Sequence, residues 1–181
     1  EFLLKSLEIQ PKNTSALNNL ATTYKGLGML KEASNFYNKA LAINPNNANS
    51  NYNLGLLFHK FGDLKKAKIY FKKTTEIKKN YALAFVGLAN VHIDLKELRE
   101  ALSCYQKAIE INPKIASAHN NLGLLYRDLQ DFENSIICYQ KAIELVPSYA
   151  NSHHNLGQIY KEMGQFEKSI KSHKTAIKYE P

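Results

Sequence analysis

Apolar and small residues recur along the chain at the spacing of amphipathic helices. Between residues 116 and 149 they lie three or four positions apart, as side chains on one helix face do. The first stripe comprises Ala118, Leu122, Gly123, Leu125, Tyr126 and Leu129, and the second comprises Ile136, Tyr139, Ala142, Ile143 and Val146. The pattern breaks between them at Gln130 and Asp131, and it therefore predicts two helices joined by a short turn.

Polar and proline residues mark the ends of these predicted helices. Asp131, like Asp63 in an earlier segment, stands where it can cap the second helix by accepting backbone N–H groups. Pro147 cannot continue that helix, because it has no N–H to donate. Gly123 and Ala142 are small enough to let the helices approach closely, whereas Tyr126 and Tyr139 are expected to fill space between hairpins.

The hairpin pattern repeats with a period of 34 residues. Prolines follow this period at Pro11, Pro45, Pro113, Pro147 and Pro181, with Lys79 in the remaining place. Leucines follow it without a break at Leu20, Leu54, Leu88, Leu122 and Leu156, each before Gly or Ala. One hairpin cannot bury both of its stripes, so neighbouring hairpins are expected to stack.

These residues resemble the tetratricopeptide repeat, in which a Leu-Gly/Ala pair, two aromatic positions, an Ala and a closing Pro recur. Full repeats then span 14–47, 48–81, 82–115 and 116–149, with a last repeat at 150–181 and the end of a preceding one at 1–13. The resemblance implies an all-α, right-handed superhelical solenoid of antiparallel helix pairs, forming a single array over residues 1–181. Apolar residues at the two ends, among them Phe2, Leu3, Leu7, Ile170, Ala176 and Ile177, should then be exposed. We expect a piece of a longer array, or ends that pack on other molecules.

In this family the first helix of each repeat lines a concave groove, through the second, fifth, sixth, ninth, twelfth and thirteenth positions. The sixth position holds Asn19, Asn53, Gly87, Asn121 and Asn155. A carboxamide offers both a donor and an acceptor, which suits an extended peptide backbone. The alternative is that each Asn bonds a neighbouring helix or loop.

Further candidate contacts lie at the other groove positions. Apolar candidates are Tyr52, Leu56, Leu83, Val86, Ile93 and Leu124, unless several pack into the core instead. Asn90 is a polar candidate. Lys25, His59, Arg127 and Lys161 alternate with Asp94, Asp128 and Glu162, so the predicted groove has mixed charge.

Three functions fit this pattern. The first is a protein-binding scaffold that holds an extended peptide or a helix of a partner in the groove. The second is the substrate-selecting region of a larger enzyme, since the Asn series and the segments AHNNLG and SHHNLG look like the repeats of O-linked N-acetylglucosamine transferases. The third is an architectural subunit that self-associates through its terminal repeats.

Other partners are disfavoured. Chaperone-binding members of the family grip a C-terminal carboxylate with Lys, Asn and Arg at set positions. This chain has Asn18, Thr22, Leu83 and Gly87 at four of them, so the cations are missing. No run of apolar residues is long enough to span a membrane, and the first residues show no secretory signal, so we expect an intracellular protein, cytoplasmic or nuclear. We see no base-reading set of side chains for nucleic acid along the predicted groove.

The remaining sequence features are the net positive charge, the cysteines and the histidines. The formal net charge is +8, and residues 48–81 hold eight lysines against two acids. Most of these lysines lie on the second predicted helix of that repeat, which is either simply solvated or a patch for an acidic partner, anionic lipid or nucleic acid. Cys104 and Cys138 are expected to be free thiols, and His92 and His173 to pack in place of repeat aromatics. His119 and His153 lack further ligands at metal-binding spacing, and no catalytic motif occurs, so we expect no metal, cofactor or enzymatic activity.

Overall fold

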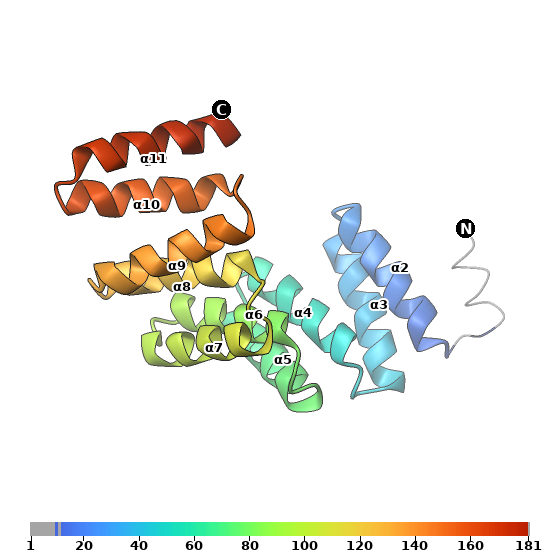
Figure 1. Cartoon of the computed structure of the whole chain (residues 1–181). Coiled ribbons are helices and arrows are strands. Elements are labelled where there is room, and N and C mark those ends of the chain that lie inside the picture. Colours follow the sequence, from blue (N-terminus) through green and yellow to red (C-terminus); the bar gives the residue numbers. More distant parts are fainter. Residues whose placement is uncertain (1–9, 11, 181) are drawn as a thin grey trace. The chain divides into compact units, whose positions relative to one another are not determined.

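The computed structural model describes residue 10 and residues 12–180, which contain ten α-helices and no strand (Figure 1). The first helices of successive pairs are α2 (Thr14–Gly26), α4 (Ala48–Lys60), α6 (Ala82–Asp94), α8 (Ala116–Asp128) and α10 (Ala150–Glu162). The second helices are α3 (Leu30–Ile43), α5 (Leu64–Ile77), α7 (Leu98–Ile111), α9 (Phe132–Leu145) and α11 (Phe166–Tyr179). The predicted all-α fold of paired helices is confirmed. The right-handed sense of a superhelix stays a prediction.

The predicted caps are in place. The Asp63 carboxylate accepts from the Lys66 N–H at 3.1 Å, and Asp131 accepts from the Asn134 N–H at 3.2 Å. The turn before each of these caps needs a residue with positive φ. Gly62 supplies it in one hairpin (φ 78°), whereas Gln130 adopts it in another (φ 60°), where a side chain is tolerated at some cost in strain.

Small and aromatic residues meet inside each helix pair. Ala142 is fully buried, and the Tyr139 ring lies so close to Gly123 that a Cβ atom there would be 2.9 Å from the ring. In α10–α11, His173 takes the place of the aromatic and lies 2.8 Å from the corresponding point on Gly157. His92 is also buried, and its Nδ1 donates a hydrogen bond to the Glu97 carboxylate. The packing role expected for both histidines is confirmed.

Two residues of the predicted stripes are not in the core. Leu129 is 46% exposed and Val146 is 41% exposed. Each is the C-cap of its helix, where the chain turns away from the helix axis. The helical spacing therefore no longer applies to them, and their assignment to the stripes was wrong.

The helices form two compact units, α2 to α6 up to Glu97 and α7 to α11 from Leu98. In the first unit, α3 packs on α4 and α5 packs on α6; in the second, α7 packs on α8 and α9 packs on α10. The buried Tyr37 of α3, for example, packs with Leu54 and Leu57 of α4. Each of these contacts joins the second helix of one pair to the first helix of the next, as stacking requires.

The end residues differ in their exposure. Ile170 and Ile177 of α11 are 56% and 64% exposed, as expected, but Ala176 is only 8% exposed. Ala176 lies on the side of α11 that meets α10, so its expected exposure was wrong. Phe2, Leu3 and Leu7 lie outside the described residues. Within residues 10 and 12–180, no helix is both long enough and apolar enough to cross a bilayer.

Candidate functional site

The side chains expected to contact a partner lie on the first helix of each pair. We call this surface the first-helix face and define it by the second, fifth, sixth, ninth, twelfth and thirteenth residues of α2, α4, α6, α8 and α10. Helices α4 and α6 contact each other in the first unit, and α8 and α10 do so in the second. Within each unit, neighbouring helices therefore bring their faces together.

In the first unit, Asn53 is the best-held amide of the predicted series. Its Nδ2 donates to the Asn49 carbonyl at 2.9 Å, and its Oδ1 accepts from the Lys25 Nζ of α2 at 2.6 Å. Partial burial lowers the pKa of Lys25. Asn19 is exposed on α2. One N–H of Asn53 is therefore bonded to its own helix backbone, as the alternative interpretation expected. Its side-chain oxygen connects α4 to α2.

In the second unit, Asn121 and Asn155 are brought together by a residue that the sequence analysis did not single out. Asn120 donates through Nδ2 to the Asn121 Oδ1 at 3.2 Å. Its Oδ1 accepts from the Asn155 Nδ2 at 3.2 Å and from the Ser152 Oγ at 3.0 Å. Asn120 is only 6% exposed, so it forms the floor of an amide cluster that spans α8 and α10.

The same pairing occurs in the first unit. The Asn18 Oδ1 accepts from the Ser50 Oγ across α2 and α4. A signal for it exists in the sequence, because the fifth position of one repeat and the third of the next change together. In the sequence these two positions hold Asn18 and Ser50, Tyr52 and Ala84, Val86 and Ala118, and Asn120 and Ser152. Polar residues are matched with polar ones, and apolar residues with Ala.

Gly87 interrupts the Asn series for a steric reason. A Cβ atom on Gly87 would lie 2.6 Å from Cε1 and Cζ of Phe71, which is fully buried on α5. The same ring lies 2.8 Å from a Cβ placed on Gly55 of its own pair. Any side chain at position 87 would therefore force the buried Phe71 ring to shift, which disfavours an asparagine there.

The apolar candidates are divided between surface and core. Leu83 is 44% exposed, and Leu56, Ile93 and Leu124 are half-buried. Val86 is 8% exposed and belongs to the core. Tyr52 is half-buried between aromatic rings, with centroids 5.0 Å from Tyr81 and 5.8 Å from Phe71, and burial raises its pKa.

The charged candidates form local pairs. His59 of α4 bonds Asp94 of α6 through Nε2 and Oδ2 at 2.6 Å, and the Arg127 guanidinium lies 3.5 Å from Asp128. Lys161 is exposed, and Asn90 is half-buried. The first-helix face of each unit therefore has both signs of charge, as the sequence analysis expected.

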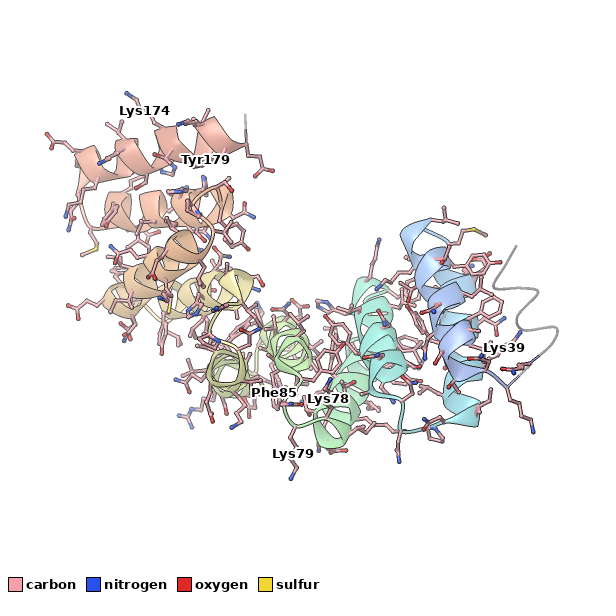
Figure 2. All side chains as sticks on the ribbon, turned by 45° about the vertical axis from the view of Figure 1, so that its right-hand side comes forward. Lys39, Lys78, Lys79, Phe85, Lys174 and Tyr179 are labelled. Carbon is pink, nitrogen blue, oxygen red and sulfur yellow. The ribbon has the colours of Figure 1, made fainter. Side chains whose placement is uncertain are left out.

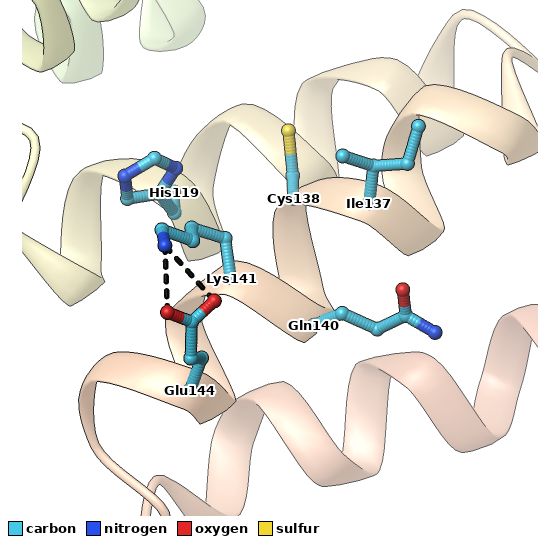
Figure 3. Close-up of a pocket in the computed structure, with 6 residues that line it drawn as sticks. All are labelled: His119, Ile137, Cys138, Gln140, Lys141 and Glu144. Atoms are coloured by element: carbon cyan, nitrogen blue, oxygen red, sulfur yellow. Dashed lines mark hydrogen bonds and ion pairs between the residues drawn. The ribbon is translucent and has the colours of Figure 1, made fainter.

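A separate hollow of about 320 Å³ lies beside Cys138 (Figure 3). Lys141 lines it and bonds both carboxylate oxygens of Glu144, at 2.8 and 2.9 Å. Burial raises the pKa of the Cys138 thiol to about 11, which makes it a poor nucleophile at neutral pH. His119 borders the hollow, but its Nε2 bonds the Pro113 carbonyl at 2.9 Å.

His119 and His153 occupy equivalent positions, and each is bonded to the carbonyl of the proline that precedes its helix. His153 bonds the Pro147 carbonyl at 2.9 Å, as His119 bonds that of Pro113. Both histidines therefore stabilise the turn before their helix. No disulfide joins Cys104 to Cys138, and no group of three metal-ligating side chains is found, within the part of the chain that the structure describes.

Paired helices that stack at a fixed period define a helical repeat protein. A family model described as TPR repeat matches residues 27–62, 89–130 and 123–164. Models described as tetratricopeptide repeat match residues 2–33, and residues 48–81 and 150–181. The chain belongs to the tetratricopeptide repeat family. No curated protein matches it significantly.

Solved structures agree with this assignment. MamA has 26% identity and a TM-score of 0.78, with 88% of this chain and 94% of that chain covered. YrrB, described as a TPR protein with an unusual peptide-binding site, has 24% identity and a TM-score of 0.77 over 100% of this chain and 93% of its own. PilF of Pseudomonas aeruginosa has 20% identity and a TM-score of 0.85 over 94% and 78%. The two likenesses below 25% identity bear on the fold alone.

Proposed function

We propose that the five repeats form one array that binds an extended segment or a helix of another protein along a groove lined by the first-helix face. Family membership supports a protein-binding scaffold. The single observation that favours this face is the Asn120 cluster, which holds the Asn121 and Asn155 amides on adjacent helices. Amides fixed in this way lose less rotational freedom when they bind a backbone.

The contacts available would give general rather than sequence-specific recognition. Asn19, Asn53, Asn121 and Asn155 would bond the partner's backbone, whereas Leu56, Leu83 and Leu124 would meet its apolar side chains. Arg127 and Lys161 would contact acidic groups. YrrB, which shares this fold, is described as having a peptide-binding site, so peptides are the ligand class that the first test uses.

Replacement of all four asparagines by alanine tests the proposal. Peptides are first selected on the wild-type chain from a displayed library of random 12-residue sequences. The variant with Asn19, Asn53, Asn121 and Asn155 changed to Ala is expected to bind the selected peptides at least about tenfold more weakly, with unchanged helical circular dichroism.

A matched control removes four asparagines from other surfaces. Asn35, Asn38, Asn80 and Asn134 are exposed on second helices or in a loop. Their replacement by Ala should leave binding unchanged. Equal losses in the two variants, or full binding by the first, would assign the peptides to another surface.

A second candidate is end-to-end self-association through α11. Phe166, Ile170 and Ile177 are 63%, 56% and 64% exposed, whereas the equivalent Phe132, Ile136 and Ile143 of α9 pack beside α10. Sedimentation velocity at increasing concentration tests it. A constant sedimentation coefficient would rule it out.

A third candidate is the substrate-selecting region of an enzyme similar to O-linked N-acetylglucosamine transferases. Its support is the sequence likeness of the Asn series and of the segments around His119 and His153. The full-length reading frame decides it, because that enzyme class requires a sugar-nucleotide-binding domain in the same protein.

A further inference from the structure

The second helix of the second repeat, α5, has a surface charge that the first-helix face does not explain. Residues 64–79 contain seven lysines and one glutamate. Three of the lysines have partners on the protein. Lys66 lies 2.9 Å from Asp63, Lys68 lies 2.7 Å from Glu97, and the Lys78 ammonium stands 5.2 Å from the centre of the Tyr81 ring.

The other four lysines remain without such partners. Among residues 10 and 12–180, no carboxylate lies within ion-pair distance of Lys65, Lys72, Lys73 or Lys79. Lys65, Lys72 and Lys79 are exposed, and Lys79 extends away from the helices (Figure 2). We call the surface formed by these four residues and Ile69 the α5 face.

In α7 and α9, the second helices of the next two repeats, the lysine equivalent to Lys73 is neutralised by a glutamate. Lys107 of α7 and Lys141 of α9 each bond a glutamate three residues later, at 2.9 and 2.8 Å. Lys73 of α5 also precedes a glutamate by three residues, Glu76, but no bond forms between them among the described residues. The α5 face therefore keeps charge that its counterparts remove.

Helix α11 is basic as well, but its lysines are arranged differently. Lys168 and Lys178 stand over the rings of Tyr160 and Tyr179, at 5.4 and 5.8 Å. Lys171 and Lys174 line a hollow that also contains Glu167. Two ammonium groups on α11 thus have neither a ring nor an ion-pair partner, compared with three on α5 and a fourth, Lys79, in the turn that follows it.

The α5 face also has an apolar centre. Ile69 is 62% exposed and lies four residues after Lys65 and three before Lys72. Positions i, i+4 and i+7 lie on one side of a helix, and seven residues span about 10.5 Å. An apolar side chain between two cations at this spacing matches a second helix that has carboxylates seven residues apart and an apolar residue between them.

We propose that the α5 face docks an acidic amphipathic helix of a partner protein, with its carboxylates on Lys65 and Lys72 and its apolar residue on Ile69. Lys73 and Lys79 extend the positive field at the C-terminal end of α5. Charge complementarity brings the partner to this face, and the fixed spacing gives it a register.

The test uses a fluorescein-labelled synthetic helix with Glu at i and i+7 and Leu between them, and a scrambled peptide of identical composition. In low salt the full chain is expected to bind the patterned peptide at least about tenfold more tightly than the scrambled one in fluorescence anisotropy. Added salt should weaken the patterned complex, because exposed charges are screened.

Three variants locate the site. Lys65→Gln with Lys72→Gln, and Ile69→Ser alone, should each weaken the patterned complex at least about tenfold. Lys171→Gln with Lys174→Gln removes the same charge from α11 and should have no effect. The four-asparagine variant should also bind normally, so a failure of the groove proposal is distinguishable from a failure of this one.

Several outcomes would overturn the proposal. Equal binding of the scrambled peptide, or an equal loss in the α11 variant, would mean that only general attraction operates. An absence of binding to the patterned peptide would show that the α5 face does not dock such a helix. If the Lys65/Lys72 variant instead lost affinity for phosphatidylserine vesicles, the face would be a membrane contact.

Discussion

At the residue scale, Gly87 shows how one core side chain decides the composition of the surface above it. Phe71 extends from its own helix pair into the next and occupies the place where a side chain at position 87 would begin. The gap in the asparagine series is thus a consequence of packing between α5 and α6, which share the first unit. Binding need not be invoked to explain it.

Gly87→Ala should therefore destabilise the fold. The added Cβ would lie 2.6 Å from a ring that is fully buried and cannot move aside freely, so the free energy of unfolding should fall by about 1–3 kcal/mol. Urea unfolding followed by circular dichroism measures it. Gly26→Ala is the control, since a Cβ placed there would have no atom within 4 Å apart from its own helix backbone and chain neighbours, and alanine favours the helix. Equal midpoints for the two variants would contradict the steric explanation.

At the element scale, neighbouring first helices are joined by matched pairs. Asn120 and Ser152 bond across α8 and α10, and Asn18 and Ser50 do so across α2 and α4. Both members of the Asn120 pair are buried, so removing one leaves a polar group without its partner. Replacing both with apolar residues removes that penalty.

A double-mutant cycle is expected to reveal this coupling. Asn120→Val and Ser152→Ala should each lower the free energy of unfolding, whereas the double variant should lose less than their sum, by about 1 kcal/mol. The double variant reproduces the Val86 and Ala118 combination already present in the sequence. Asn151→Val with Ser152→Ala is the control cycle, because Asn151 is exposed. Additive losses in the Asn120 cycle would refute the pairing.

At the scale of the whole molecule, the buried Cys138 thiol and Tyr139 phenol make the free energy of unfolding depend on pH in the alkaline range. Burial raises the pKa of Cys138 from 9.0 to about 11 and that of Tyr139 from 10.0 to about 12. Above pH 9 the unfolded chain loses these protons first. Their contribution to stability is therefore complete below about pH 9 and is lost as the pH rises towards 11 and 12.

The expected result is a fall in the urea midpoint between pH 9 and 11. Cys138→Ala should make this fall smaller, because the variant has no thiol at that position to titrate. Unfolding curves at pH 7, 9, 10 and 11 measure both effects. A wild-type midpoint that is constant to pH 11, or an identical fall in the variant, would show that the thiol is not protected by burial.

Much of the fold could be predicted from local patterns. The stripes around Leu122 and Tyr139 and the caps at Asp63 and Asp131 were identified correctly, because helical spacing and capping depend on residues close in sequence. Leu129 and Val146 were assigned wrongly, since a stripe does not reveal the residue at which the helix axis ends. The candidate face was harder to predict, because exposure depends on contacts between helices.

Residue types repeated along the chain are enough to predict the helix pairs, their period and the family. Tertiary structure decided which amides meet and which lysines keep an unpaired charge. Asn120 connects Asn121 to Asn155, and Lys73 stays apart from Glu76, only through the geometry of the packed helices. Both features depend on distances between side chains, and residue spacing alone does not contain those distances.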